Sequence, residues 1–190
     1  MPRIGVKDLH VHELLEETDT SANYGEAQRI VDLIEVSITP QVNSAELYAD
    51  DRLANSISVL SSFDITIGVA ELSPEIQAKL LGQEVDENGG VFTSSKMNPP
   101  SFAVSFRAER SDGTYEYRQM FKVKFAPTDE TYNTKGETPD FQTESITGIS
   151  MPLQHNGQFN YKIVDKEGAF DDTWFDEIHA TDATVASPLP

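Results

Sequence analysis

Four histidines and a large excess of carboxylates are the residues best suited to catalysis in this chain of 190 residues. His10 and His12 stand two apart, so on a strand their side chains would share a face while Glu13 would point the other way. These residue types could bind a metal ion. However, the sequence contains no HExxH motif, glycine-rich phosphate loop or GxSxG turn that would place them in an enzyme site. The pattern therefore favours a protein that is not an enzyme.

Adjacent carboxylates are frequent because the chain has 32 acidic residues. A glycosidase needs two carboxylates roughly 5–10 Å apart across a cleft, whereas neighbours on a strand point to opposite faces. The acidic run at 86–89 lacks the alternating ligands and the terminal glutamate of a calcium loop. We therefore expect no metal ion and no cofactor. An acidic hydrolase with a deep cleft remains an alternative.

The composition excludes several other classes. Fourteen Lys and Arg against 32 Asp and Glu give a net charge of −18, so the chain does not bind nucleic acid by neutralising phosphates. The chain has no cysteine, which excludes disulfides, thiolate nucleophiles and cysteine metal sites. No apolar stretch approaches the ~20 residues of a membrane span, and residues 1–7 lack the apolar run of a signal peptide. We expect folding in a cytoplasm and no membrane partner.

Alternating apolar and polar residues predict a mainly β protein. One predicted strand, 115–125, places Tyr115, Tyr117, Gln119, Phe121, Val123 and Phe125 on a single face. The Asp112-Gly113 pair suits a tight turn and predicts a hairpin over 101–126. The other predicted strands are 34–38, 65–69, 102–106, 141–151 and 159–164.

One short helix is predicted over 74–81, with Ser73 as N-cap, Pro74 at the first helical position and Gly82 as the stop. A turn or a second helix could occupy 171–178. The segments 40–61 and 127–140 are predicted to be long polar loops, and loops of that length are usually functional or disordered. Residues 1–180 are predicted to form a single domain, and 181–190 an exposed C-terminal arm.

Several stretches, in the right order, resemble the major tail protein (tail tube protein) family of long-tailed phages and prophages of Gram-positive bacteria. The most specific are a signature and a loop, namely Leu47-Tyr48-Ala49-Asp50-Asp51 and Tyr132-Asn133-Thr134-Lys135-Gly136. The other similar stretches are 4–9, 71–89, 137–143 and 172–178. The resemblance therefore covers nearly the whole chain.

The resemblance implies a fold of tail-tube type, that is, a β-sandwich or partly closed barrel with a flanking helix. It also implies hexameric rings that stack into a tube around a tape-measure protein, with a tail terminator and tail-tip or baseplate proteins as further partners. DNA would pass through the lumen without specific binding. The protein would be assembled in the host bacterial cytoplasm and reside in the virion tail. An acidic lumen would keep DNA from adhering to the wall.

The segment 40–61 is the best candidate for an arm that reaches the next ring. Apolar anchors would be Leu47, Tyr48, Leu53 and Ile57. Trp174 and Phe175 could either anchor to a partner or cap the domain's own core. The full set of candidate contact residues is Leu47, Tyr48, Asp50, Asp51, Leu53, Ile57, Tyr132, Lys135, Trp174 and Phe175. Competing interpretations are a tail terminator or head decoration protein of the same particle, and a β-sandwich ligand-binding module.

Overall fold

The computed structural model describes residues 1–49, 52–134 and 143–185, with the backbone alone at 47–49 and 52–54. The one α-helix among these residues is α1 (Pro74–Leu81), and a 3-10 helix covers Asp172–Asp176. The strands are β1 (Arg3–Glu17), β2 (Ala22–Tyr24), β3 (Gln28–Ile30), β4 (Leu33–Ala49), β5 (Arg52–Val69), β6 (Glu84–Val85), β7 (Val91–Phe92), β8 (Ser101–Arg110), β9 (Tyr115–Ala126), β10 (Glu144–Ser150), β11 (Asn160–Asp165) and β12 (Ala183–Val185).

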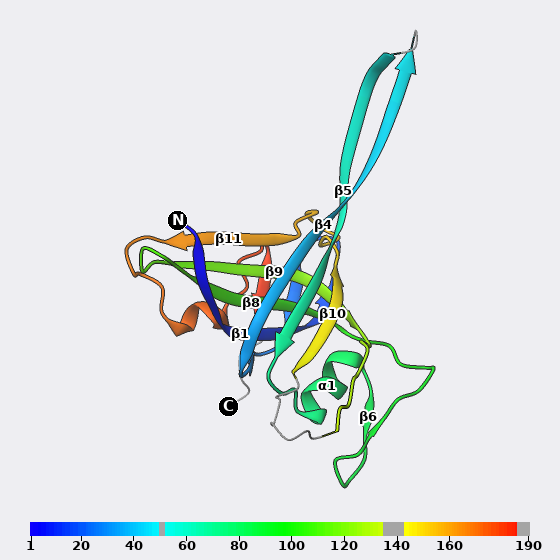
Figure 1. Cartoon of the computed structure of the whole chain (residues 1–190), viewed down its shortest axis with the longest axis vertical. Helices are drawn as coiled ribbons and strands as arrows, with labels where there is room; N and C mark the ends of the chain where they lie inside the picture. The colour runs from blue at the N-terminus through cyan, green and yellow to red at the C-terminus, as the bar shows by residue number, and fades with distance from the viewer. Residues whose placement is uncertain (50–51, 135–142, 186–190) are drawn as a thin grey trace.

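Most of the strands belong to one sheet with the order β12-β2-β1-β8-β9-β10-β5-β4. Strand β9 is long enough to pair with β11 along its first half and with β10 along its second half. The sheet folds over itself, so that β4 and β5 cross in front of β8 and β9 (Figure 1). It does not close, because β4 pairs only with β5 in the described sheet. The predicted mainly β, sandwich-like fold with one short helix is therefore confirmed.

Helix α1 has the predicted limits because its ends are determined locally. The Ser73 hydroxyl accepts a hydrogen bond from the Ile76 N–H, and Pro74 begins the helix. Gly82 adopts the left-handed conformation at φ 64°, and a Cβ there would lie 2.6 Å from the Asn98 carbonyl oxygen. Only glycine fits such a position. Leu80 and Leu81 point into the core.

The largest core cluster lies between the two crossing layers and beneath α1. Its centre includes Leu9, Ile65, Ile67, Phe102 and Phe125, each at most 2% exposed. Two smaller clusters lie on the other side of β8 and β9, one around Tyr24, Phe121 and Leu153 and one around Tyr117, Trp174 and Phe175. The central strands are thus covered on both faces.

The segment 40–61, for which the sequence predicts a long polar loop, is instead the outer part of a long β-hairpin. Strands β4 and β5 pair from Leu33↔Val69 to Ala49↔Arg52, with register shifts at Gln41/Val42 and Leu47/Tyr48. The sequence there is polar because these strands bury neither face in the subunit. The hairpin projects from the body as an arm (Figure 1).

Three further differences concern ends and short elements. Residues 183–185 are not part of a free arm, since β12 pairs in parallel with β2. The predicted strand at 141–151 begins at Glu144 as β10, and 135–142 and 186–190 lie outside the described residues. The possible helix at 171–178 is a 3-10 helix, Asp172–Asp176. The 101–126 hairpin is confirmed, with Gly113 at φ 79° in its turn.

Candidate assembly surfaces

The arm exposes large apolar side chains that the subunit itself leaves uncovered. The exposed fractions are 52% for Val42, 60% for Ile57 and 59% for Val59. In a soluble subunit, a projecting hairpin of this kind gains nothing from apolar residues. An exposed apolar patch on a projection is typical of a surface that another protein covers.

The apolar side chains of the arm are distributed unequally between its two faces. Directly paired residues share a face, and successive residues alternate. The pairs Asn43↔Val59 and Ala45↔Ile57 therefore place Ile57 and Val59 on one face. The opposite face carries Ser56 and Ser58, the latter paired with Ser44, and at its base the pair Val42↔Leu60. Beyond that base, the face with Ile57 and Val59 is suited to an apolar contact and the serine face to solvent.

Only part of the predicted arm contact can be placed at side-chain level. Leu47, Tyr48 and Leu53 belong to the paired strands, but their side chains lie outside the description, as do Asp50, Asp51 and Lys135. Ile57 is exposed, as a contact with another subunit requires, and the contact itself stays a prediction. Val42 and Val59 are further exposed apolar residues of the arm that the sequence did not single out. The alternation of Ser56, Ile57, Ser58 and Val59 is a strand pattern that could have indicated Val59.

A groove of about 360 Å³ runs beside the free edge of β4. Its apolar lining comes from β1, β4 and β8 and comprises Val6, Ile34, Val36, Ile38, Phe106 and Ala108. Arg3 donates to Glu116 at 2.6 Å in the same groove. The pKa of the neighbouring Arg118 is lowered by burial and by the charge of Arg3, and its buried Nε has no hydrogen-bond partner among the described residues. Such a lining suits a protein surface better than water.

Trp174 and Phe175 lie in the chain's own core, which is one of the two positions that the sequence allowed. They are 6% and 0% exposed. Phe175 stacks on His10 with ring centroids 4.5 Å apart and also contacts Tyr117. His10 and His12 share a face of β1 as predicted, and both contact Phe175: His12 Nε2 lies 2.7 Å from its carbonyl oxygen. These contacts fasten residues 171–180, here called the C-terminal segment, to the sheet.

Arg107 also holds the C-terminal segment to the sheet, through ion pairs. Its guanidinium lies 2.7 Å from Asp8 and 3.1 Å from Asp172. Asp8 has a positive φ of 58°, at an irregularity in the pairing of β1 with β8. The rings of Tyr115 and Tyr117 face the guanidinium at 5.2 and 6.0 Å. The guanidinium and both carboxylates are therefore paired within the subunit, and these ion pairs hold β1, β8 and the 3-10 helix together.

Tyr132 is the most exposed of the candidate residues whose side chains the structure describes, at 85%. Its hydroxyl donates to Glu130 at 2.6 Å, and this bond, followed by one from Gln77, lowers the pKa of Glu130. The residues border a polar hollow of about 500 Å³ between α1 and β10.

Among the described residues no three His, Asp or Glu side chains are grouped to hold a metal ion, and no helix is long and apolar enough to cross a membrane.

Asp165 organises the loop that leads into the C-terminal segment. Its carboxylate accepts hydrogen bonds from the N–H groups of Phe170, Ala169 and Glu167 at 3.0, 3.0 and 3.2 Å. The Phe170 N–H is the largest cause of the lowered pKa of Asp165, and the other two contribute. Hydrogen bonds to the ionised form have this effect generally.

Replacing Asp165 by asparagine should lower stability at pH 7 and weaken the dependence of stability on acid. Because the folded pKa lies below the unfolded value of about 3.9, the carboxylate stabilises the fold above that pH, and this contribution disappears as pH falls through the folded pKa. Urea unfolding at pH 7 and below pH 4 would measure how the free energy of unfolding depends on pH in each variant. The exposed Asp176→Asn is the control, and equal acid dependence in wild type and D165N would contradict the assignment.

Comparison with known families identifies a match over most of the chain. A family model described as phage tail tube protein matches residues 34–180, which include both strands of the arm, α1 and the C-terminal segment. No curated protein matches the chain.

Proposed function

We propose, from the premise that this chain belongs to the phage tail tube protein family, that it polymerises as stacked hexameric rings into a tube that conducts DNA during ejection. Membership gives the protein a structural role in the virion tail. The ring number, the stacking contacts and the passage of DNA are the proposed part.

The observation that carries the proposal is the arm. Its eight residues from Val42 to Ala49 span roughly 25 Å at the usual rise of a strand, and its apolar face has no partner within the described part of the subunit. A patch on a projection, complementary to a surface elsewhere on the same molecule, makes a heterologous contact that repeats without closing. Contacts of that kind stack rings into a tube.

Ring closure would use the free edge of β4. An open sheet edge exposes unpaired N–H and C=O groups and invites association with another chain. The adjoining groove adds apolar side chains and the unpartnered Nε of Arg118. Six copies, each contributing β4, β5, β10 and part of β9, would give a barrel wider than the 16–18-stranded barrels that already enclose an aqueous channel. The tape-measure, terminator and tail-tip proteins would meet the tube at its interior and ends.

Electron microscopy of the purified protein over a concentration series tests the proposal. We expect tubes of uniform width with a central channel, appearing above a threshold concentration. Single closed rings that do not stack would instead favour the tail terminator. Monomers at every concentration, also after addition of preformed tail tips as initiators, would contradict polymerisation and favour a ligand-binding module.

A further inference from the structure

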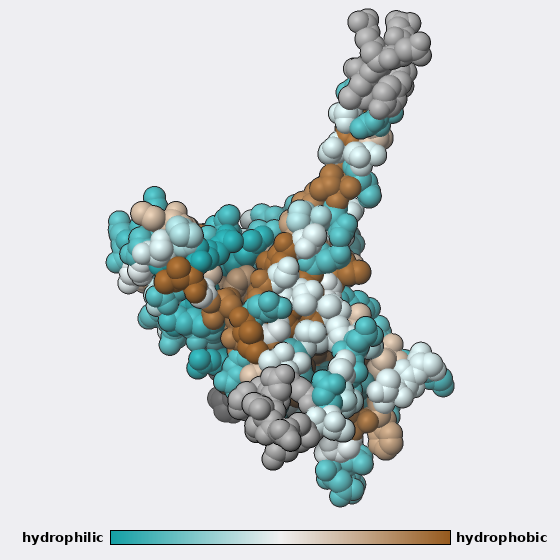
Figure 2. All heavy atoms as spheres, in the orientation of Figure 1, coloured by the Kyte–Doolittle hydropathy of each residue, from teal (hydrophilic) through white to brown (hydrophobic). Residues whose placement is uncertain are grey.

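The layer formed by β4, β5, β10 and the second half of β9 has one covered and one uncovered face. The covered face packs against β1 and β8 through Ile65 and Ile67, and against α1 through Leu80 and Leu81. In Figure 2, a pale band of intermediate hydropathy follows β4, β5 and β10 on the opposite face. The subunit's other main layer and its helix therefore lie on one side of this layer.

We propose that the uncovered face lines the channel of the tube and presents a hydroxyl-rich wall to the passing DNA. This inference rests on the proposed tube. In a ring closed through strand edges, each sheet turns one face toward the axis. Packed layers are about 10 Å apart, so the second layer and the helix would narrow the channel by about 10 Å on every side if they pointed inward. The uncovered face is the one that leaves the channel widest.

The side chains on this face are mostly short and hydroxylated. Cross-strand pairing aligns Ser37, Thr66 and Thr147 in one row, and Thr39, Asp64 and Ile149 in the next. Further members of the face are Ser62, Ser101 and Ser145. Hydroxyls donate to and accept from water and phosphate alike, without a charge. A wall of this kind remains hydrated and offers DNA no strong attachment.

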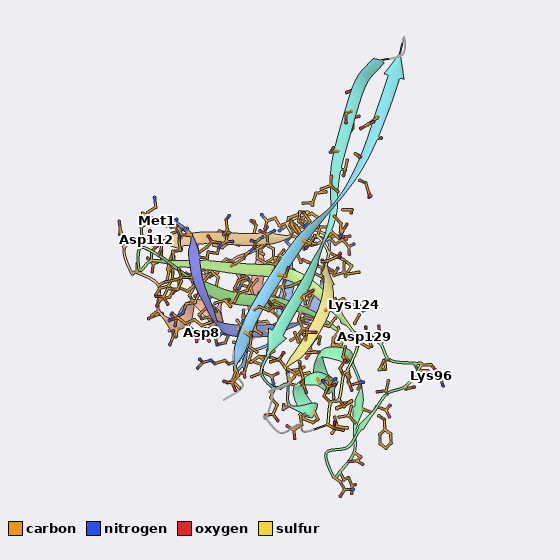
Figure 3. The ribbon with its side chains drawn as sticks, in the orientation of Figure 1. Met1, Asp8, Lys96, Asp112, Lys124 and Asp129 are labelled. Carbon is orange, nitrogen blue, oxygen red and sulfur yellow. The ribbon has the colours of Figure 1, made fainter. Side chains whose placement is uncertain are left out.

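Few charges interrupt the hydroxyl rows among the described residues. Asp64 accepts from the Gln41 amide at 2.6 Å. Glu35 lies over Gly68, where a Cβ would approach its Cγ to 2.9 Å. Lys124 continues the second row between Ile149 and Ser101, beside β10 (Figure 3), and donates to Asn98. Lys122 alternates with the buried Val123 and so shares this face, where Glu17 pairs with it. The remaining two acids against one lysine leave one acidic charge in excess per subunit among the described residues. Strong DNA binding needs clustered Lys and Arg, whereas the described part of this face has Lys124 alone besides the paired Lys122. On this assignment the acidic lumen expected from composition would be only weakly acidic and largely hydroxylated.

Single-cysteine labelling of assembled tubes tests the assignment, since the natural chain has no cysteine. Thr66→Cys and its cross-strand neighbour Thr147→Cys place a thiol on the face. Ser94→Cys, on an exposed connection after β7, is the matched control. Each variant is treated with a small maleimide and with a maleimide on a polymer too large for the channel, before and after assembly, and tubes are verified by electron microscopy.

We expect all three thiols to react with both reagents in unassembled subunits. In tubes, the Thr66 and Thr147 variants should still react with the small reagent but lose reaction with the polymer, while the Ser94 variant reacts with both. Reaction of the Thr66 and Thr147 variants with the polymer in intact tubes would place the face outside. Loss of reaction with both reagents would place it in an interface. Either result overturns this inference alone, whereas failure of the wild type to form tubes overturns the proposed function and this inference with it.

Discussion

Replacing Ile57 and Val59 together by aspartate should abolish tube formation and leave the subunit folded. Full burial of each side chain is worth about 1.5–3 kcal/mol, and an aspartate buried at the same contact would need a partner to offset its desolvation. This loss of contact free energy recurs in every subunit of every ring. Because the two side chains are 60% and 59% exposed, the free energy of unfolding should change by less than about 1 kcal/mol.

The matched control is the double substitution Ser56→Asp and Ser58→Asp. It adds the same charge to the same strand, but on the opposite face of the arm. Tubes should persist in the control, and circular dichroism with urea unfolding should show both variants folded. If the serine variant also failed to assemble, added charge and not the apolar face would be responsible. Tubes formed by the Ile57/Val59 variant would show that this face makes no required contact.

The elements predicted best from sequence are those that local chemistry determines. Helix α1 has its predicted limits because Ser73, Pro74 and Gly82 act within a few residues of its ends. The 101–126 hairpin follows from the Asp112-Gly113 turn. Neither prediction required knowledge of the rest of the fold. The short strands β2, β3 and β12 were missed because three residues contain no readable alternation, and tertiary pairing alone makes them strands.

The hairpin form of the arm was missed for a different reason. Alternation reveals a strand when one face is buried, and the outer parts of β4 and β5 are exposed on both faces within the subunit. Pairing between the two strands holds them extended, since each supplies the partner for the other. The sequence thus identified the segment as a candidate for assembly through its resemblance to a family, while its form as a hairpin came only from the structure.

A register shift explains the error on β9. The sequence placed Tyr115 to Phe125 on one face at every second residue. However, Val104 pairs with Met120 while Phe102 pairs with Val123, so β9 contains one extra residue between them. A shift of one residue exchanges the faces. Phe121 therefore packs in the second cluster, and Val123 and Phe125 pack beneath α1. The extra residue has no signature in the sequence.

Replacing Phe175 by alanine should be the most destabilising single change in the C-terminal segment. The side chain is fully buried against His10, Tyr117 and Trp174. Truncation of a buried phenylalanine costs about 3–5 kcal/mol, a large share of the roughly 5–15 kcal/mol that stabilises a domain. At about 2–4 °C per kcal/mol for a chain of this size, the melting temperature should fall by roughly 6–20 °C. Thermal unfolding of the unassembled subunit measures it.

The same experiment decides between the two roles that the sequence allowed for this residue. A core residue destabilises the isolated subunit when truncated, whereas an intersubunit anchor would leave that stability unchanged and weaken only assembly. The exposed Asp176→Ala, one residue away, is the control and should change the free energy of unfolding by no more than about 0.5 kcal/mol. A Phe175→Ala subunit with the stability of the wild type would show that the segment detaches from the core in solution. In that case Phe175 would become available to a neighbouring copy, and the fastening role of His10 and His12 would fail with it.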